Sequence, residues 1–190
     1  DRSVVEKELD IDLSKPTMLM IQHPVTTEKD KAFDQIVETV EAIKASGVQC
    51  VVLLPNNDAG HSKIVEYIKS ADLKWFPSLS GNIFVNLYRN VSALIGNSSS
   101  GIHETPTLKI PTINIGSRQN ARERAENVLD VANDRNEILK AIDKAINDKA
   151  FRKKVKNIVN PYGSGNSAKQ IVEVLRTRDL DNLVQKVFHD

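Results

Sequence analysis

Short apolar runs rich in valine, isoleucine and leucine alternate along this chain with stretches whose apolar residues recur every three or four positions. Short runs of this kind are typical of buried strands, whereas the three-and-four spacing is typical of amphipathic helices. The pattern predicts five strands, at residues 17–22, 50–54, 73–76, 93–96 and 112–115, and a sixth, less apolar strand at 128–131.

The longest helix is predicted at residues 29–45. Its apolar face is formed by Phe33, Ile36, Val37, Val40 and Ile43. Thr27 is placed to cap the start of this helix, and Gly47 is placed to end it. Further helices are predicted at residues 62–70, 84–90, 101–107, 133–147, 149–157 and 167–175.

Strands separated by helices predict an α/β protein. Right-handed βαβ crossovers would place the strands in one parallel sheet, with helices on both faces. The last predicted helix, at residues 167–175, carries an apolar face of its own. We expect it to cover a surface that need not belong to the same domain.

Composition narrows the possible classes of protein. The 190 residues are enough for one full domain but not for two catalytic domains. The 26 Lys and Arg residues nearly balance the 25 Asp and Glu residues, so net charge gives no reason to expect nucleic acid or an anionic membrane as a partner. No apolar run approaches the roughly 20 residues that a membrane-spanning helix needs. We expect a soluble domain with a substantial core.

The single cysteine, Cys50, excludes an internal disulfide and a cysteine-rich metal site. A reducing cytoplasm is therefore the expected location. The chain starts at Asp1 rather than at a methionine, and residues 1–15 have neither the cationic start nor the apolar stretch of a signal peptide. We expect the chain to be a piece of a longer protein.

The loop between the fourth strand and the next helix, residues 96–101, consists only of small residues and is called the serine loop below. Small side chains let the backbone approach a ligand, and amides and hydroxyls at a helix start can hold a diphosphate. Glu104 follows where a carboxylate could accept both hydroxyls of a ribose. The alternative is a serine-capped helix with Glu104 as its dipole partner. Phe84, shortly before this loop, could stack on a nucleobase or simply belong to the core.

His23 directly follows the first predicted strand and precedes Pro24, which favours an extended, exposed turn. An imidazole there could donate or accept a proton near neutral pH, although a lone loop histidine most often has no such role. No two histidines have the close spacing of a metal site, so no metal is expected.

Arginines follow the fifth predicted strand. Arg118, Arg122 and Arg124 carry guanidinium groups, which suit forked contacts with phosphate. The alternative is a solvated basic turn that pairs with Glu123 and Glu126.

Three stretches of sequence together are similar to one family. They are QHPVTT at 22–27, PNNDAG at 55–60, and a segment from 95 to 129 that starts IGNSSSGIHE and continues through INIGSRQ to ENVL. In order and spacing they resemble the hydrolysing UDP-N-acetylglucosamine 2-epimerases, especially the branch that makes N-acetylmannosamine for sialic acid and related nonulosonates.

The resemblance implies half of an enzyme. The family has two Rossmann-like domains of the glycosyltransferase-B type with the active site between them, and this chain is similar to the C-terminal one. Residues 1–15 would then connect from a missing N-terminal domain, and residues 16–160 would form a Rossmann-like UDP-binding domain. Residues 161–190 would form C-terminal helices that pack toward the missing domain.

The resemblance also assigns the nucleotide contacts. Ser98 and Ser99 match the serines that hold the diphosphate, and Glu104 matches the acid that binds the ribose. Arg118 matches an arginine of the same UDP site, and Arg122 follows it with a looser match.

Three further positions complete the implied site. Phe84 falls where related epimerases place an aromatic ring against uracil, and Asn56 matches another nucleotide-site position. His23 matches the histidine that faces the sugar and is important for catalysis.

The reaction of the family eliminates UDP to leave a 2-acetamidoglucal and then adds water, giving N-acetylmannosamine without a cofactor. The carboxylates that move the protons lie in the N-terminal domain. UDP and a UDP-2-acetamido sugar are thus the expected ligands, and the full-length form is expected to be a homo-oligomer. Two alternatives stay open: a stand-alone nucleotide-sugar binding module, and the C-terminal domain of a glycosyltransferase of the same architecture.

Overall fold

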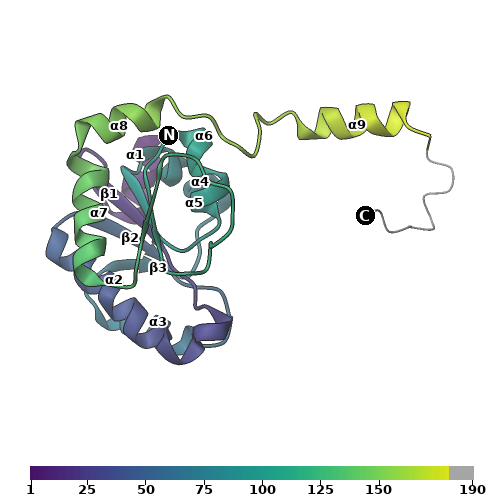
Figure 1. The fold of residues 1–190 in the computed structure, drawn as a ribbon. Helices are drawn as coiled ribbons and strands as arrows, with labels where there is room; N and C mark the ends of the chain where they lie inside the picture. Colours follow the sequence, from purple (N-terminus) through teal and green to yellow (C-terminus); the bar gives the residue numbers. More distant parts are fainter. Residues whose placement is uncertain (180–190) are drawn as a thin grey trace.

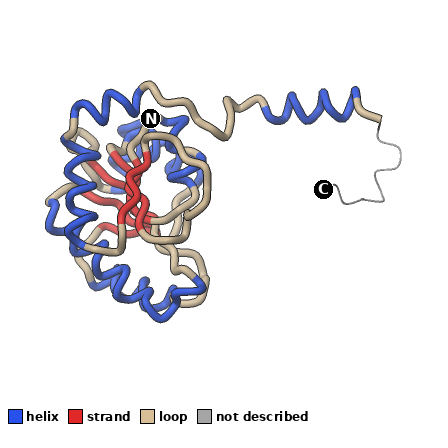
Figure 2. Tube along the Cα trace, in the orientation of Figure 1, coloured by secondary structure: helices blue, strands red, loops and turns tan. Residues whose placement is uncertain are grey.

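A parallel six-stranded sheet forms the centre of the protein in the computed structural model, which describes residues 1–179 (Figures 1 and 2). The strands are β1 (Thr17–Ile21), β2 (Gln49–Leu53), β3 (Lys74–Phe76), β4 (Ala93–Gly96), β5 (Thr112–Ile115) and β6 (Val128–Val131). Their order across the sheet is β3-β2-β1-β4-β5-β6, with every pair parallel. The predicted α/β Rossmann-like fold is confirmed, and each predicted strand is present.

Helices connect the strands. They are α1 (Arg2–Leu9), a 3-10 helix η1 (Thr26–Lys31), α2 (Ala32–Ser46), α3 (His61–Ser70), α4 (Gly81–Asn90), α5 (Ser100–His103), α6 (Thr105–Leu108), α7 (Arg135–Asn147), α8 (Lys149–Lys156) and α9 (Ser167–Thr177). Within residues 1–179, none of them is long and apolar enough to cross a membrane.

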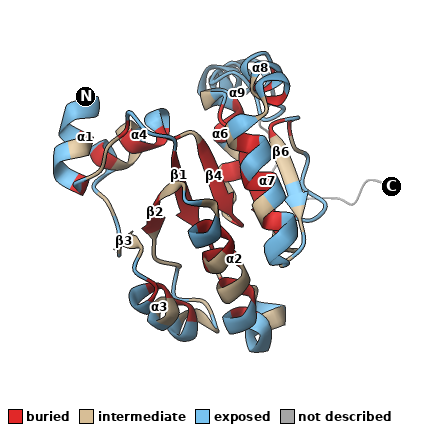
Figure 3. Cartoon of the chain, turned by 90° about the vertical axis from the view of Figure 1, so that its left-hand side faces the viewer, coloured by how far each residue is buried: buried red, intermediate tan, exposed pale blue. Residues whose placement is uncertain are grey.

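Each face of the sheet is buried under its own layer of helices. Successive side chains of a strand point to opposite faces, so Met18 and Met20 of β1 pack with α2, α3 and α7, whereas Leu19 and Ile21 pack with α1 and α4. All five residues of β1 are therefore buried and four of them are hydrophobic, as in a strand covered on both sides (Figure 3).

The long helix starts later than predicted. Residues 26–31 form η1, and α2 begins at Ala32 after Lys31, which makes no side-chain capping bond. Thr27 therefore does not cap α2, and that prediction is wrong. The physical reason is Glu28, whose backbone departs from helical geometry (φ −122°, ψ 21°) and interrupts the first turn. At the other end Gly47 adopts φ +63° and ends α2 as predicted.

Phe33 does not belong to the apolar face that the spacing predicted for α2. Phe33 is 43% exposed near the start of α2. The ring packs edge-on against Tyr67 of α3, with centroids 5.6 Å apart. Ile36, Val40 and Ile43 carry the contact with the sheet instead.

The two ends of the chain behave differently. Helix α1, which hydrophobic spacing did not predict, buries Val5 and Leu9 beside α4, so residues 1–15 pack on the sheet. Helix α9 instead extends away from the body and buries none of its residues (Figure 1). The prediction for 161–190 reaches into residues 180–190, which lie outside the described part.

Candidate functional site

The loops that follow the strands meet at the carboxyl edge of the sheet, where β1 and β4 lie side by side and the strand order reverses. Ligands of open parallel sheets bind at this edge. Gly96 makes the meeting of β1 and β4 possible, because a Cβ atom there would lie 2.2 Å from the carbonyl oxygen of Ile21. With φ +127°, the backbone of Gly96 also adopts a conformation that side chains disfavour.

Asn97 fastens three of these loops together. Its Oδ1 accepts a hydrogen bond from the backbone N–H of His23 (2.7 Å), and its Nδ2 donates to the His23 carbonyl (2.8 Å). Its own carbonyl oxygen accepts from Nη1 of Arg118 (3.2 Å) and from Nε2 of Gln119 (2.8 Å). The buried side chain of Asn97 thus joins the loops after β1 and β4, and its backbone carbonyl joins them to the loop after β5.

The imidazole of His23 is half-buried and held in one orientation. Its Nδ1 accepts a hydrogen bond from the backbone N–H of Asn56, at 3.1 Å. Burial, and next the positive charge of Arg118, lower the pKa of His23, while Asp58 acts in the opposite direction. The ring is therefore neutral at pH 7, and because Nδ1 is an acceptor, its proton is on Nε2.

The serine loop presents hydroxyl groups that bond mainly to one another. The Oγ atoms of Ser98 and Ser100 lie 3.0 Å apart, and the backbone N–H of Ser100 donates to Ser98 Oγ at 3.3 Å. Ser98, Ser99 and Ser100 are all partly exposed. The loop can therefore offer hydroxyl donors to an anion from the solvent side.

The helix predicted at residues 101–107 is two short helices, α5 and α6, with Glu104 at the junction. The macrodipole of one turn is small, so amides and hydroxyls are the main anion-binding groups of the loop. Glu104 is exposed, and within residues 1–179 its carboxylate makes no hydrogen bond or ion pair.

A buried polar network supports α5 and α6 from below. Thr105 Oγ1 donates to the carbonyl of Gly101 (2.6 Å) and accepts from Thr112 Oγ1 (2.8 Å) and Asn127 Nδ2 (2.9 Å). A Cβ atom on Gly101 would lie 2.6 Å from Thr112 Cγ2, so only glycine lets α5 sit this close to β5. The network therefore holds the backbone next to Glu104 against β5.

The predicted arginines occupy two different places. Arg118 is half-buried beside Asn97 and His23. Arg122 is exposed and bonds through Nη1 to Nε2 of His103, at 2.8 Å. Arg124 pairs with Asp130, an acidic residue other than the two partners, Glu123 and Glu126, that the alternative of a basic turn named. Arg118 is thus joined, through Asn97, to the loop after β1 that carries His23 (residues 22–25, called the histidine loop below). Arg122 is joined to α5.

Phe84 and Asn56 are the remaining predicted residues. Phe84 is partly exposed on α4, with its ring centroid 5.3 Å from that of Tyr88. Asn56 is exposed; its backbone N–H binds His23, and its side chain donates to Asp58 Oδ2 at 2.7 Å. The structure therefore joins Asn56 directly to His23.

Beside His23 lies an open pocket of about 560 Å³. Its lining is Pro24, Val25, Thr26, Thr27, Glu28, Asp58, Ser117 and Arg118. Glu28 accepts hydrogen bonds from Ser117 and from Gln35, and these bonds lower the pKa of its carboxyl group. Within residues 1–179, no group of three His, Cys, Asp or Glu side chains is arranged to hold a metal ion.

Sequence reasoning missed the roles of Asn97, Gln119, Glu28 and Ser117. Each holds a loop through hydrogen bonds that join residues between 7 and 89 positions apart. The available signal was a polar residue directly after a buried strand, which describes Asn97.

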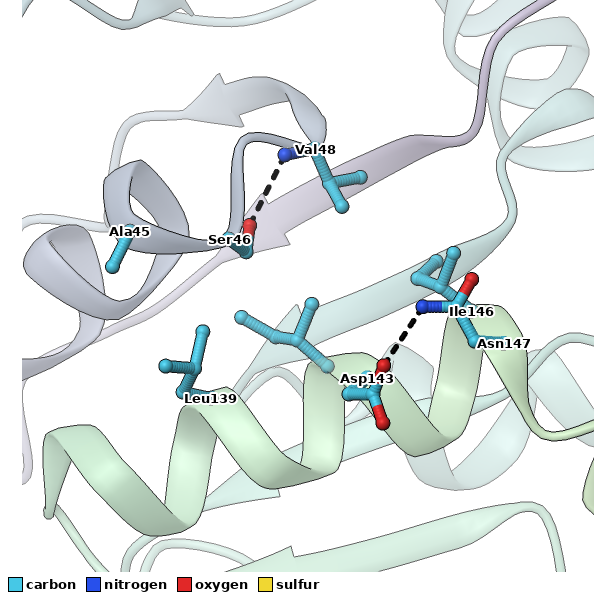
Figure 4. Close-up of a pocket in the computed structure, with 8 residues that line it drawn as sticks. Ala45, Ser46, Val48, Leu139, Asp143, Ile146 and Asn147 are labelled. Atoms are coloured by element: carbon cyan, nitrogen blue, oxygen red, sulfur yellow. Dashed lines mark hydrogen bonds between the residues drawn. The ribbon is translucent and has the colours of Figure 1, made fainter.

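A second hollow, of about 270 Å³, lies at the opposite edge of the sheet, between the end of α2 and α7 (Figure 4). Its lining mixes apolar residues, among them Ala45, Leu139 and Ile146, with polar ones. Its polar groups bond within the hollow: Val48 N–H donates to Ser46 Oγ (3.2 Å), and Asn147 Nδ2 donates to Asp143 Oδ1 (2.8 Å). It offers no convergent polar groups to a ligand.

Known proteins similar to this chain include curated 2-epimerases. Among curated relatives, the "UDP-N,N'-diacetylbacillosamine 2-epimerase (hydrolyzing)" of Legionella pneumophila is 33% identical over 187 residues, which is 96% of this chain and 48% of the relative. The "UDP-N-acetylglucosamine 2-epimerase" of Neisseria meningitidis is 30% identical over 172 residues, which is 88% of this chain and 45% of the relative. The chain spans about half the length of the curated relatives it matches.

Solved structures confirm the fold. The N. meningitidis UDP-GlcNAc 2-epimerase bound to UDP-GlcNAc superposes with a TM-score of 0.75 at 21% identity, covering 93% of this chain and 49% of that one. The Methanocaldococcus jannaschii UDP-GlcNAc 2-epimerase in complex with UDP-GlcNAc and UDP gives 0.69 at 20% identity, covering 91% and 48%.

The family described as UDP-N-acetylglucosamine 2-epimerase matches residues 1–176, which is nearly the whole chain. Together with the serine loop, the histidine loop and the parallel sheet that positions them, this match means that the chain belongs to the UDP-N-acetylglucosamine 2-epimerase family.

Proposed function

We propose that this chain is the UDP-binding half of a hydrolysing 2-epimerase that converts a UDP-2-acetamido sugar and water into UDP and the free, epimerised sugar. The observation that carries the proposal is the Asn97 junction. It brings a neutral histidine, a guanidinium group and the serine loop to one edge of the sheet.

The nucleotide would be held by groups that the protein leaves available. Ser98 and Ser99 would donate hydroxyl hydrogen bonds to the diphosphate, with Arg118 and Arg122 beside them. Glu104, whose carboxylate has no partner within residues 1–179, would accept from the ribose hydroxyls. The uracil ring would pack on the exposed part of Phe84.

The proposed reaction places charge on the diphosphate. A base removes the proton from C2 of the sugar, the electron pair forms a C1–C2 double bond, and the C1–oxygen bond breaks so that UDP leaves. Negative charge then develops on the UDP oxygens, where fixed amides, hydroxyls and a guanidinium group stabilise the transition state. Water then adds across the double bond to give the free sugar.

His23 would act on the sugar side of the cleft. It is neutral and holds its proton on Nε2, so it can donate a hydrogen bond or a proton to a group that becomes negative. The pocket beside it, whose lining includes Pro24 and Arg118, would receive the sugar.

The remaining parts of the active site would come from a second, N-terminal domain. We place the carboxylates that move the C2 proton there, and we propose that α9 packs against that domain. Support for the packing comes from Ile171, Val172, Val174 and Leu175 of α9, each between 52% and 58% exposed. We further propose a cytoplasmic homo-oligomer. The substrate class is a UDP-2-acetamido sugar, since similar proteins are named as 2-epimerases of UDP-N-acetylglucosamine and of UDP-N,N'-diacetylbacillosamine.

Two measurements on the 190-residue chain test this proposal. Calorimetry should detect UDP binding, and a product assay with UDP-GlcNAc should detect no released sugar, because we place the proton-moving carboxylates in the N-terminal domain. Failure to bind UDP would contradict the nucleotide site. Release of N-acetylmannosamine by this chain alone would contradict the division of labour between two domains.

A further inference from the structure

A tyrosine hydroxyl is buried without a partner behind the serine loop. Tyr88 of α4 is 3% exposed, and within the described residues its hydroxyl oxygen makes no hydrogen bond. Buried polar groups are nearly always paired, so an unpaired one calls for an explanation, such as a partner that arrives with a ligand. Neither the family match nor the site described above assigns this residue a role.

The surroundings of Tyr88 connect it to the nucleotide site. Its ring contacts that of Phe84, with centroids 5.3 Å apart and planes tilted by 42°. The Ser100 side chain lies within reach of its hydroxyl, and the Glu104 carboxylate acts on it through its charge. Burial raises the pKa of Tyr88 most strongly; Ser100 opposes this shift and Glu104 adds to it. The phenol therefore keeps its proton and is a donor at neutral pH.

Ser100 links this donor to the serine loop. Its Oγ lies 3.0 Å from Ser98 Oγ, and its backbone N–H donates to the same atom. A hydroxyl carries one proton and accepts at two lone pairs. If Ser100 donates both its hydroxyl and its N–H to Ser98 Oγ, both lone pairs of Ser98 are occupied. The Ser98 proton then has only the solvent side to point to.

We propose that Tyr88 is a positioning residue for the diphosphate: its hydroxyl donates to Ser100 Oγ in the liganded protein, Ser100 donates to Ser98, and Ser98 donates to the anion. The proposal rests on the proposed UDP site. Without ligand, the Tyr88 hydroxyl has no hydrogen-bond partner within residues 1–179, and either Ser98 or Ser100 could be the donor of their shared bond. An anion at Ser98 selects one direction for all three hydroxyls, and chains of hydrogen bonds strengthen one another.

The variant Tyr88→Phe tests this relay, because it keeps the ring and its packing on Phe84 and removes only the hydroxyl. UDP affinity of the 190-residue chain, measured by calorimetry, should fall about 3- to 10-fold, the range for losing one hydrogen bond. Uridine, which lacks the diphosphate, should bind equally to both proteins in an NMR titration. The melting temperature without ligand should stay equal or rise, because an unpaired buried hydroxyl has been removed.

A merely structural tyrosine would give the opposite result: Tyr88→Phe would lower the melting temperature and leave UDP affinity unchanged. A loss that is equal for UDP and uridine would also overturn the relay. As a matched control, Tyr67→Phe removes a hydroxyl that bonds to Glu41 on another part of the protein, and it should leave UDP affinity unchanged.

A double variant separates this inference from the proposed function. If Tyr88 acts through Ser100, the double variant Tyr88→Phe/Ser100→Ala should bind UDP no more weakly than Ser100→Ala alone. Additive losses would overturn the relay. If the unaltered chain does not bind UDP at all, the proposed function itself fails. If it does, and Tyr88→Phe binds UDP equally well, only the role of Tyr88 is refuted.

Discussion

The loop after β1 and the serine loop after β4 leave neighbouring strands, yet the protein holds them in different ways. The backbone of His23 is bonded on both sides by Asn97, and its ring is fixed by Asn56. In the serine loop, Ser98 and Ser100 bond to each other, and after the loop the Glu104 carboxylate has no partner within residues 1–179. A group that acts on a reacting bond needs a fixed position, whereas groups that bind a ligand must have free donors and acceptors.

Removing the fixed imidazole should have the largest effect. In the complete enzyme, His23→Ala should lower kcat by about 10²–10⁴-fold, the usual contribution of a general acid or base. UDP affinity should change little, because the nucleotide is assigned to the other loop. Steady-state UDP release and UDP calorimetry measure the two quantities. His61→Ala, on α3, is the control, and an unaltered kcat in His23→Ala would remove His23 from the mechanism.

Loosening the loop without touching the imidazole should come next. Asn97→Ala removes both bonds to the His23 backbone and should cost about 2–3 kcal/mol in the free energy of unfolding, since two backbone groups lose their partner. We expect kcat to fall as well. Asn97→Asp keeps an acceptor for the His23 N–H and should lie between the two proteins in urea denaturation. Equal stability of Asn97→Ala and the unaltered protein would show that the junction does not hold the loop.

Removing the Glu104 carboxylate, which follows the serine loop, should have a smaller effect, on ligand binding rather than on stability. Glu104→Ala should weaken UDP binding by about 1–3 kcal/mol, because ribose hydroxyls lose a charged acceptor. The melting temperature should not change, since the Glu104 carboxylate makes no hydrogen bond or ion pair within residues 1–179. Glu66→Ala, an exposed change on α3, is the control. Unchanged affinity with a lower melting temperature would support the alternative in which Glu104 serves only the helix.

The smallest effect concerns pH. The pKa of His23 is lowered in the folded protein from 6.5, so the unfolded chain takes up this proton first as the pH falls. Stability from neutral His23 is therefore complete above about pH 6.5 and decreases below it, until the folded-state pKa is passed. The melting temperature of the unaltered protein should fall more steeply than that of His23→Gln between about pH 7 and pH 5. Parallel curves would contradict a buried, neutral ring.

The fold followed closely from local patterns. Apolar runs predicted the six strands, because a strand covered on both faces must be apolar at nearly every position. The spacing of apolar residues failed for Phe33, which is exposed near the start of α2 and packs on Tyr67 instead. It also missed α1, since one face of a short terminal helix carries too few apolar residues to stand out. The start of α2 also escaped, because it depends on Glu28 bonding to a residue 89 positions away.

The candidate site divides along the same line. The order of small, polar and charged residues after each strand made His23, the serine loop, Glu104 and Arg118 candidates, since loops at the carboxyl ends of parallel strands must meet. The resemblance to a family then assigned their roles, which stay predictions. Only the tertiary structure decided that Asn97 joins those loops. It also decided that Arg118 bonds to Asn97 whereas Arg122 bonds to His103, and that an unpaired Tyr88 hydroxyl lies behind the serine loop. The pattern of apolar residues indicates which side chains are buried. The partner of a buried polar group depends instead on distances that are set only when the sheet and its loops are assembled.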